Sequence, residues 1–446
     1  MAVTVFRDAD ILTADPADRV LESGWLAVED GRIVGLGDSP SRGTGDADTV
    51  VRLPGHAILP GLVNAHTHSP MVLFRGRAEA HSLLTMEGWW SAIREPELAL
   101  DAADIVPAAA LSYAEMAASG TTLVADQYFF ADEVLTAASA SGLRATIAYG
   151  IVELGDAERG RRELANAISF VDRTAVRSDD RCLGWIGPHA PYVDNSEPLL
   201  AAAAAAARER GVGLHLHMAV GPDDNELPQS VFGTTAAVAL ERSGFFRAWV
   251  LAAHCLDLSD DDIAVFARSG AAVAHCPTAG LRSGRPAMTP VVALRGAGVT
   301  VALGSDNVAA NNSYDLFTEM KVAGLVAAHR EGRAGALPAS VLLRMATIDG
   351  ARALGLGGET GSLEVGKAAD LAIVDLRRLG YSATPDLATL LVYSGSGRDV
   401  RHVLVRGEWI VRDFRLVRHD LEALRAAYDV VYRRFWDRVS AAKEVA

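Results

Sequence analysis

The sequence predicts an α/β fold, a (β/α)8 TIM-like barrel with a small β-sandwich domain built from both chain ends. Short apolar runs alternate with helical stretches through the middle of the chain. Polar residues follow most of these runs, and alternating strands with tight turns occur only near the two ends. The 446 residues are enough for one barrel and one accessory domain.

Residues 1–57 and 360–415 are predicted to form the β-sandwich domain. The first segment contains "GWLAVEDGRIVGLG" and the second "VRHVLVRGEWIVRD", and both read as short strands broken by turns that contain glycine. Neither segment shows a helical period. We therefore expect the two segments to share one domain.

Residues 58–359 are predicted to form the barrel. Eight near-continuous apolar runs predict parallel strands covered on both faces: "LVNAHTH", "TTLVAD", "LRATIAYGIVE", "LGWIGPH", "VGLHLH", "WVLAAH", "AAVAHC" and "VTVALGSD". The alanine run 201–207 predicts an outer helix that ends at Gly211. Residues 416–446 form a helical extension, amphipathic from about Leu421 to Ala442, expected to pack across the barrel or against a partner subunit.

Composition favours a small-molecule enzyme. The net charge of −14 disfavours nucleic acid and anionic membranes, which attract clustered basic residues. Three cysteines without CxxC spacing suggest neither a disulfide framework nor a thiolate zinc site. The N-terminus lacks a signal-peptide pattern, so we expect a cytoplasmic protein, and we expect a homo-oligomer, either a dimer or a tetramer.

Polar residues end or follow seven of the eight predicted strands, where barrel enzymes place their active sites. These are His66, His68, Asp126, His189, His217, His254, His275 and Asp306. His66 and His68, at i and i+2 of a strand, point to the same face and can bind one ion. With His217 and Asp306 they make a three-histidine, one-carboxylate set with an open position, which is typical of catalytic rather than structural metal sites.

The motifs resemble those of a known family. "PGLVNAHTHSPMVLFRG", "GPHAPY", "LHLH", "AHCP", "LGSDNVAANN" and "MATIDGARALGLGGETGSLEVGKAADLAIVDL" are similar to motifs of the amidohydrolase superfamily. The similarity covers almost the whole chain. It is greatest to the branch that holds S-adenosylhomocysteine, methylthioadenosine and guanine deaminases and the triazine chlorohydrolases.

This resemblance implies the roles of several residues. One divalent metal, usually zinc and sometimes iron, would bind His66, His68, His217 and Asp306, and a water on that metal would be the nucleophile. Asp306 would also act as general base, and His254 would contact the water or the developing tetrahedral centre. His189 and Glu87 match residues that bind substrate in the nucleoside deaminases.

Other residues near these motifs have less specific roles. Trp89 and Trp90 are candidates for stacking on a flat ring or for packing a loop. His215, His275 and Asp126 are interpreted as structural, since His215 points to the same side as His217 but lies deeper in the barrel.

Two departures from the family pattern bear on substrate. The deaminases typically read His-x-x-Glu after the fifth strand, but this chain has Val220 in place of the proton-carrying glutamate. Where S-adenosylhomocysteine deaminases place a carboxylate-binding arginine after the third strand, this chain has Tyr149. A substrate tail bearing a carboxylate is therefore disfavoured, and Tyr149 and Val220 are expected to border the substrate.

The missing glutamate leaves alternatives for proton transfer. Asp223, Asp224 or Glu226 could enter the site from the following loop, although such acids more often cap the next helix. Asp306 and His254 could instead share every proton transfer.

The leading hypothesis is a metal-dependent hydrolase of C–N bonds that deaminates a purine-, pterin- or triazine-like heterocycle. One alternative is hydrolysis of a cyclic amide or a carbon–halogen bond. Another is a binding protein that has lost turnover because Val220 replaces the glutamate.

Overall fold

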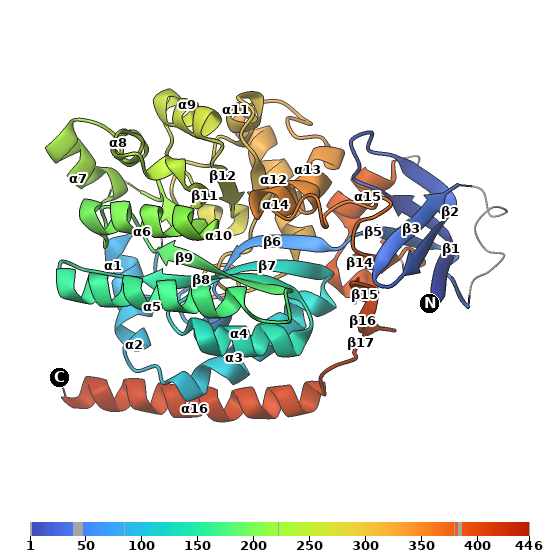
Figure 1. Cartoon of the computed structure of the whole chain (residues 1–446), viewed down its shortest axis with the longest axis horizontal. Helices are drawn as coiled ribbons and strands as arrows, with labels where there is room; N and C mark the ends of the chain where they lie inside the picture. The colour runs from blue at the N-terminus through green and yellow to red at the C-terminus, as the bar shows by residue number, and fades with distance from the viewer. Residues whose placement is uncertain are drawn as a thin grey trace.

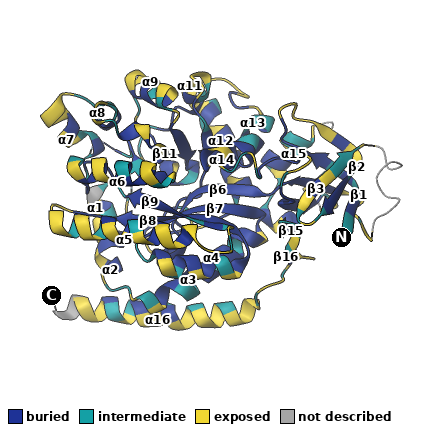
Figure 2. Cartoon of the chain, viewed as in Figure 1, coloured by how far each residue is buried: buried dark blue, intermediate teal, exposed yellow. Residues whose placement is uncertain are grey.

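Eight parallel strands form a nearly closed barrel at the centre of the computed structural model (Figure 1). The structure describes residues 2–38, 48–83, 85–221, 223–378, 380–381 and 386–445; residues 39–47, inside the predicted β-sandwich segment, lie outside this described part. The barrel strands are β6 (Leu62–Thr67), β7 (Thr121–Tyr128), β8 (Arg144–Ile151), β9 (Cys182–Pro188), β10 (Gly213–Met218), β11 (Trp249–His254), β12 (Ala272–His275) and β13 (Val301–Leu303). Their apolar side chains are almost all buried, as the apolar runs predict (Figure 2).

Helices surround the barrel. The longer ones are α3 (Ala102–Ala118), α4 (Ala131–Ser141), α5 (Ala157–Ala175), α6 (Glu197–Arg210), α7 (Asp223–Phe232), α8 (Ala236–Ser243), α9 (Asp260–Ser269), α12 (Leu316–Arg330) and α15 (Leu387–Ser394). The shorter ones are α1 (Met86–Trp89), α2 (Glu95–Glu97), α10 (Pro277–Arg282), α11 (Val291–Gly296), α13 (Ala339–Met345) and α14 (Ile348–Ala353). Helix α6 contains the alanine run and ends at Gly211, whose φ of 64° is left-handed, so that prediction is confirmed.

The first and last barrel strands meet at a seam. The Asp306 backbone N–H donates to the His66 carbonyl at 3.0 Å, and the Thr67 hydroxyl donates to the Asp306 carbonyl at 3.0 Å. A Cβ at Gly304 would lie 2.8 Å from the His66 Cβ, so only glycine allows this approach. The seam therefore brings the His66–His68 segment beside Asp306.

Both chain ends contribute to a second, mixed sheet, shown in blue and orange-red in Figure 1. Its order is β17-β16-β15-β14-β5-β1-β2-β3, and β4 pairs with β1. Its strands are β1 (Val3–Leu12), β2 (Val20–Glu29), β3 (Arg32–Gly37), β4 (Thr49–Arg52), β5 (His56–Pro60), β14 (Leu371–Asp375), β15 (Val400–Val405), β16 (Glu408–Arg412) and β17 (Arg415–Leu416). The antiparallel β5–β14 pair joins the two ends, with Ile58 opposite Ile373. The predicted fold class, a barrel with a β-domain from both ends, is confirmed.

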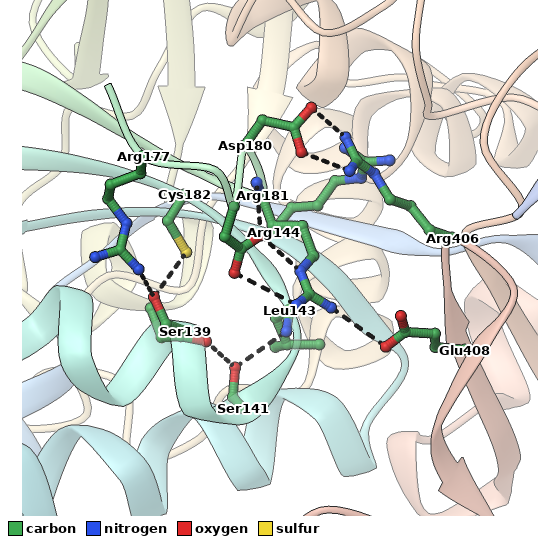
Figure 3. Close-up of polar contacts among 12 residues, drawn as sticks. Ser139, Ser141, Leu143, Arg144, Arg177, Asp180, Arg181, Cys182, Arg406 and Glu408 are labelled. Atoms are coloured by element: carbon green, nitrogen blue, oxygen red, sulfur yellow. Dashed lines mark hydrogen bonds and ion pairs between the residues drawn. The ribbon is translucent and has the colours of Figure 1, made fainter. Parts of the chain in front are cut away.

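Polar contacts join the β-sheet domain to the barrel at the amino ends of β8 and β9 (Figure 3). Asp180 accepts two hydrogen bonds from Arg406, at 2.5 and 2.8 Å, and Arg181 pairs with Glu408 at 3.3 Å. Deeper in the junction, the buried Arg144 Nε lies 2.6 Å from Asp370 Oδ2. This is the end of the barrel opposite the strand-end histidines, where such contacts serve stability.

The last helix, α16 (Leu421–Val445), packs along α3 (Figure 1). Arg434 and Arg438 pair with the buried Asp104 of α3, and the Trp436 indole N–H donates to the Leu73 carbonyl at 3.0 Å. Leu73 belongs to the turn that follows His68. The helix thus packs across the barrel, one of the two predicted placements, and supports the segment that carries two of the candidate metal ligands. Among the described residues, no helix has the length and apolar character needed to cross a membrane.

Candidate metal centre and active site

Four barrel segments bring histidine and aspartate side chains to one point. His66 and His68 lie at the end of β6, His217 on β10, His254 at the end of β11, and Asp306 after β13. The ligand atoms of His66, His68 and Asp306 lie within 4.8 Å of one another, and so do those of His66, His217 and His254. The structure therefore brings together the four predicted ligands and His254.

Hydrogen bonds fix the orientation of two of these rings. His68 Nδ1 lies 2.7 Å from the Gln127 carbonyl, and His217 Nδ1 lies 3.0 Å from the His189 carbonyl. A carbonyl only accepts, so each Nδ1 is the donor and each neutral ring has its lone pair on Nε2. The two Nε2 atoms are 3.2 Å apart. Two lone pairs this close repel each other, and a cation between them removes the conflict.

The other two groups converge on the same point. His66 Nδ1 contacts His215 Nε2 at 2.8 Å, while His66 Nε2 is buried and, within the described residues, has no hydrogen-bond partner. Asp306 Oδ1 lies 3.5 Å from His66 Nε2 and 3.6 Å from His68 Nε2. Three imidazole lone pairs and one carboxylate at such distances fit a divalent cation.

Burial sets the protonation states of this site. It lowers the pKa of His68 to about 4 and holds the pKa values of His66 and His217 well below the usual histidine range. These rings are therefore neutral at neutral pH, and a metal does not have to displace a proton from them. Burial raises the pKa of the Asp306 carboxyl. Asn307 Nδ2 donates a hydrogen bond of 2.9 Å to this carboxyl, which has the opposite, smaller effect on its pKa.

Two residues of the site adopt a left-handed backbone conformation, Asp306 with φ 57° and His254 with φ 71°. For residues other than glycine this conformation costs roughly 1–3 kcal/mol, and such strain concentrates at functional sites. Asp306 has a ligand atom within 4.8 Å of one of His66, and His254 has one within 4.8 Å of those of His66 and His217.

A cavity opens above these groups and has a flat aromatic wall. His68, His217, His254 and Asp306 line its floor. The His189 Nδ1 lies 2.5 Å from the buried Asp194 carboxylate, which holds the ring in place, and the Trp89 ring lies 5.4 Å from that of His189. Further lining residues are Phe129, Gly150 and Val220. These rings give the cavity a flat, largely apolar wall, a lining typical of sites for planar ligands.

Some predicted substrate residues lie away from this cavity. Glu87 and Trp90 are exposed and border an open groove outside it. The Tyr149 hydroxyl donates to Glu163 at 3.2 Å on α5, and the next residue, Gly150, borders the cavity instead. Of the predicted substrate residues, His189, Trp89 and Val220 line the cavity.

The residues interpreted as structural contact the candidate metal ligands or the segments that carry the catalytic groups. Asp126 accepts from the Ser69 backbone N–H and the Tyr113 hydroxyl, and His215 orients His66. The Thr289 hydroxyl donates to the His254 carbonyl at 2.7 Å and lies 3.0 Å from His275 Nδ1. These contacts fix the positions of the groups that face the cavity.

Glu97 lines the cavity but was not among the residues predicted from the sequence. It is buried, it accepts from the Tyr128 hydroxyl at 2.6 Å and from Arg94 at 3.0 Å, and burial raises its pKa. It lies on the short helix α2, which has no strand-end position and no periodic pattern, so no sequence signal could have identified it.

Comparisons with known proteins agree with this architecture. Residues 57–410 match the model of the amidohydrolase family. The chain is 38% identical over 438 residues to a 5'-deoxyadenosine deaminase of Methanosarcina acetivorans, covering 97% of this chain and 99% of that one. It is 37% identical to a 5-methylthioadenosine/S-adenosylhomocysteine deaminase of Desulforudis audaxviator, with coverage of 94% and 96%.

Solved structures show the same similarity. A zinc-bound adenosine deaminase from Xanthomonas campestris superposes with a TM-score of 0.90 at 30% identity, covering 99% of each chain. A zinc complex of atrazine chlorohydrolase from Arthrobacter aurescens gives a TM-score of 0.87 at 26% identity, covering 96% of this chain and all of the other.

Proposed function

The chain belongs to the amidohydrolase family and is a hydrolase of carbon–nitrogen bonds, and from that premise we propose that it deaminates an adenine nucleoside without a charged 5' substituent. Hydrolysis would replace the exocyclic amino group of the ring with oxygen and release ammonia. Relatives named for 5'-deoxyadenosine and for methylthioadenosine and S-adenosylhomocysteine support the adenine ring as the recognised group.

The charge of the cavity wall is the observation that carries the choice of substrate. The charged side chains that line the cavity within the described residues are all acids, and none is lysine or arginine. They are Glu97, Asp194, Asp223, Asp224 and Asp306. Arg285 lies at the edge of the cavity, where it donates to the Val220 carbonyl at 3.1 Å and lines the neighbouring groove. A substrate carboxylate or phosphate inside the cavity would therefore lose its water beside like charges, which costs free energy. A neutral nucleoside avoids this cost.

The family and the donor atoms support a divalent metal ion, and we propose one zinc ion, with iron(II) as the alternative. His66, His68, His217 and Asp306 would hold it. When bound, the ion supplies a water molecule whose pKa is lowered toward neutrality. The uncharged state of the three buried rings at neutral pH suits this role.

Protein groups move the protons. The Asp306 carboxylate, close to both His66 Nε2 and His68 Nε2, is placed to accept a proton from the attacking water. The His254 ring stacks on that of His217, with centroids 5.4 Å apart, and its buried Nδ1 has no partner among the described residues. His254 is thus placed to hydrogen-bond the oxygen that adds to the ring carbon. Trp89 and His189 orient the heterocycle above these groups.

Substrate comparison tests the proposal. We expect kcat/KM for 5'-deoxyadenosine to exceed that for S-adenosylhomocysteine at least tenfold, because about 1.4 kcal/mol of unfavourable carboxylate burial already corresponds to tenfold. Ammonia release on both substrates gives the measurement, and methylthioadenosine, which has the 5' sulfur but no charged tail, is the control. A preference for S-adenosylhomocysteine would show that the acidic residues of the cavity do not determine which 5' substituent the enzyme accepts.

A second reaction is favoured by one residue. Val220 lines the cavity where the deaminases carry a carboxylate, and a leaving group that departs as an anion does not need a proton. Hydrolysis of a carbon–halogen bond on a similar ring is therefore the second candidate, and the similarity to atrazine chlorohydrolase supports it.

A further inference from the structure

A buried carboxylate lies beside Val220 in the cavity wall. Asp224 is the second residue of α7, is only 8% exposed, and lines the same cavity as His217 and His254. Ala219 directly follows β10 with a left-handed φ of 49°, and the Asp224 carboxylate contacts the backbone N–H groups of the next two residues, Val220 and Gly221. Asp224 thus reaches the region that Val220 occupies.

One oxygen of Asp224 remains available. The backbone N–H groups of Val220 and Gly221 both donate to Oδ2, the second at 3.2 Å, and no described residue donates to Oδ1. Burial raises the pKa of this carboxyl to about 6, against the smaller effects of the two hydrogen bonds, so that part of the population keeps its proton near neutral pH.

The other acids of the inner cavity wall are already engaged. Both oxygens of Glu97 accept hydrogen bonds, from Tyr128 and Arg94. Both oxygens of Asp194 accept as well, one from His189 and the other from the Ala190 backbone and Asn195. Among these three buried carboxyls, only Asp224 therefore has an oxygen that is not used inside the protein.

Deamination requires an acid at this place. An amino group leaves a carbon as ammonia only if its nitrogen gains a proton while the C–N bond breaks. Asp306 is occupied with the proton of the attacking water, and Val220 has no proton to give. We propose that Asp224 is a catalytic residue that donates the proton of its Oδ1 to the departing amino nitrogen. This assignment rests on the deaminase function proposed above.

The step balances as follows. Water adds its oxygen to the ring carbon while Asp306 takes one of its protons and later returns it to the ring nitrogen that received the electron pair. The C–N bond then breaks, and its electron pair leaves on nitrogen, which takes the proton from Asp224. As the carbonyl forms, the proton still on the added oxygen passes to the His254 ring, and its release from His254 restores the proton that Asp224 gave. The products are the lactam ring and ammonia.

A comparison of two leaving groups distinguishes a catalytic acid from a residue that only supports the structure. Asp224→Asn keeps an oxygen that can accept from Val220 and Gly221 but has no acidic proton. On 5'-deoxyadenosine we expect kcat to fall roughly 10²-fold, the usual contribution of a positioned acid. On the analogue with chlorine in place of the amino group we expect a fall of less than about threefold, because chloride takes no proton when it leaves.

Ammonia and chloride release, measured on the same preparations, give the result. Glu226→Gln, an exposed acid of the same helix outside the inner cavity, is the matched control and should change neither rate. If Asp224→Asn does not fold, as judged by its thermal unfolding, Asp224→Ser replaces it, since serine also accepts from the turn and carries no acidic proton.

The outcomes are distinct. An equal fall with both leaving groups in a folded variant, or no fall with either, would overturn the role of Asp224 while ammonia release by the unmodified enzyme still supports the deaminase. If the unmodified enzyme releases chloride but no ammonia, the proposed deaminase function fails, and the role of Asp224 fails with it.

Discussion

Asp306→Asn is expected to lower deamination by at least ~10³-fold, because one residue provides both an anionic ligand and the base for the attacking water. Asparagine has nearly the same shape and tolerates the left-handed backbone that Asp306 adopts at φ 57°. The seam between β13 and β6 should therefore remain intact, since its hydrogen bonds use the backbone of residue 306. The loss would reflect chemistry rather than misfolding.

The metal content of the unmodified protein and of Asp306→Asn is measured together with their activity. The purified protein should hold about one divalent ion per chain, and Asp306→Asn should hold it less tightly because a neutral amide replaces the carboxylate among the donors. Asp429→Asn, an exposed aspartate on α16, is the control. Full activity of Asp306→Asn, or an active unmodified protein without metal, would contradict the assignment of this site.

His254→Asn is expected to lower kcat by at least ~10²-fold while leaving the metal bound. The imidazole of His254 stacks on His217 and has a buried, unpartnered Nδ1 within the described structure, so it can exchange a proton with the oxygen that adds to the substrate. Asparagine can still donate a hydrogen bond but does not titrate near neutral pH. A large loss in kcat would therefore identify proton transfer rather than hydrogen bonding alone.

Two measurements make this test decisive. His329→Asn removes an exposed histidine on α12 and should leave the rate unchanged. If His254→Asn loses its metal, His254 is a ligand, as its grouping with His66 and His217 allows. If the rate falls less than about threefold with the metal retained, Asp306 and Asp224 carry the protons without it.

The strand pattern and the strand-end histidines were readable from the sequence because each depends on local order. Continuous apolar runs mark strands buried on both faces, and i, i+2 spacing places His66 and His68 on one side of β6. The parallel barrel then requires every such strand end to open on the same face. For this reason the fold class and the gathering of His66, His68, His217 and Asp306 could be predicted without coordinates.

The substrate wall could not be predicted in the same way, because its members come from segments without a shared period. Glu97 reaches the cavity from the short helix α2, and Glu87, ten residues before it, is exposed outside. Along a strand, adjacent side chains point to opposite faces, so Tyr149 contacts α5 while Gly150 borders the cavity.

The sequence by itself determined the barrel, the β-domain from both chain ends and the residue types of a catalytic metal site, because apolar periodicity and strand-end position are encoded in neighbouring residues. Only the tertiary structure decided which oxygen or nitrogen of each group is free. His68 is oriented by a carbonyl of β7 and His217 by the carbonyl of His189, which follows β9, and the burial of Asp224 depends on how the start of α7 packs beside the cavity. Protonation state and available lone pairs depend on burial and on partners distant in the chain, and these exist only once the chain has folded.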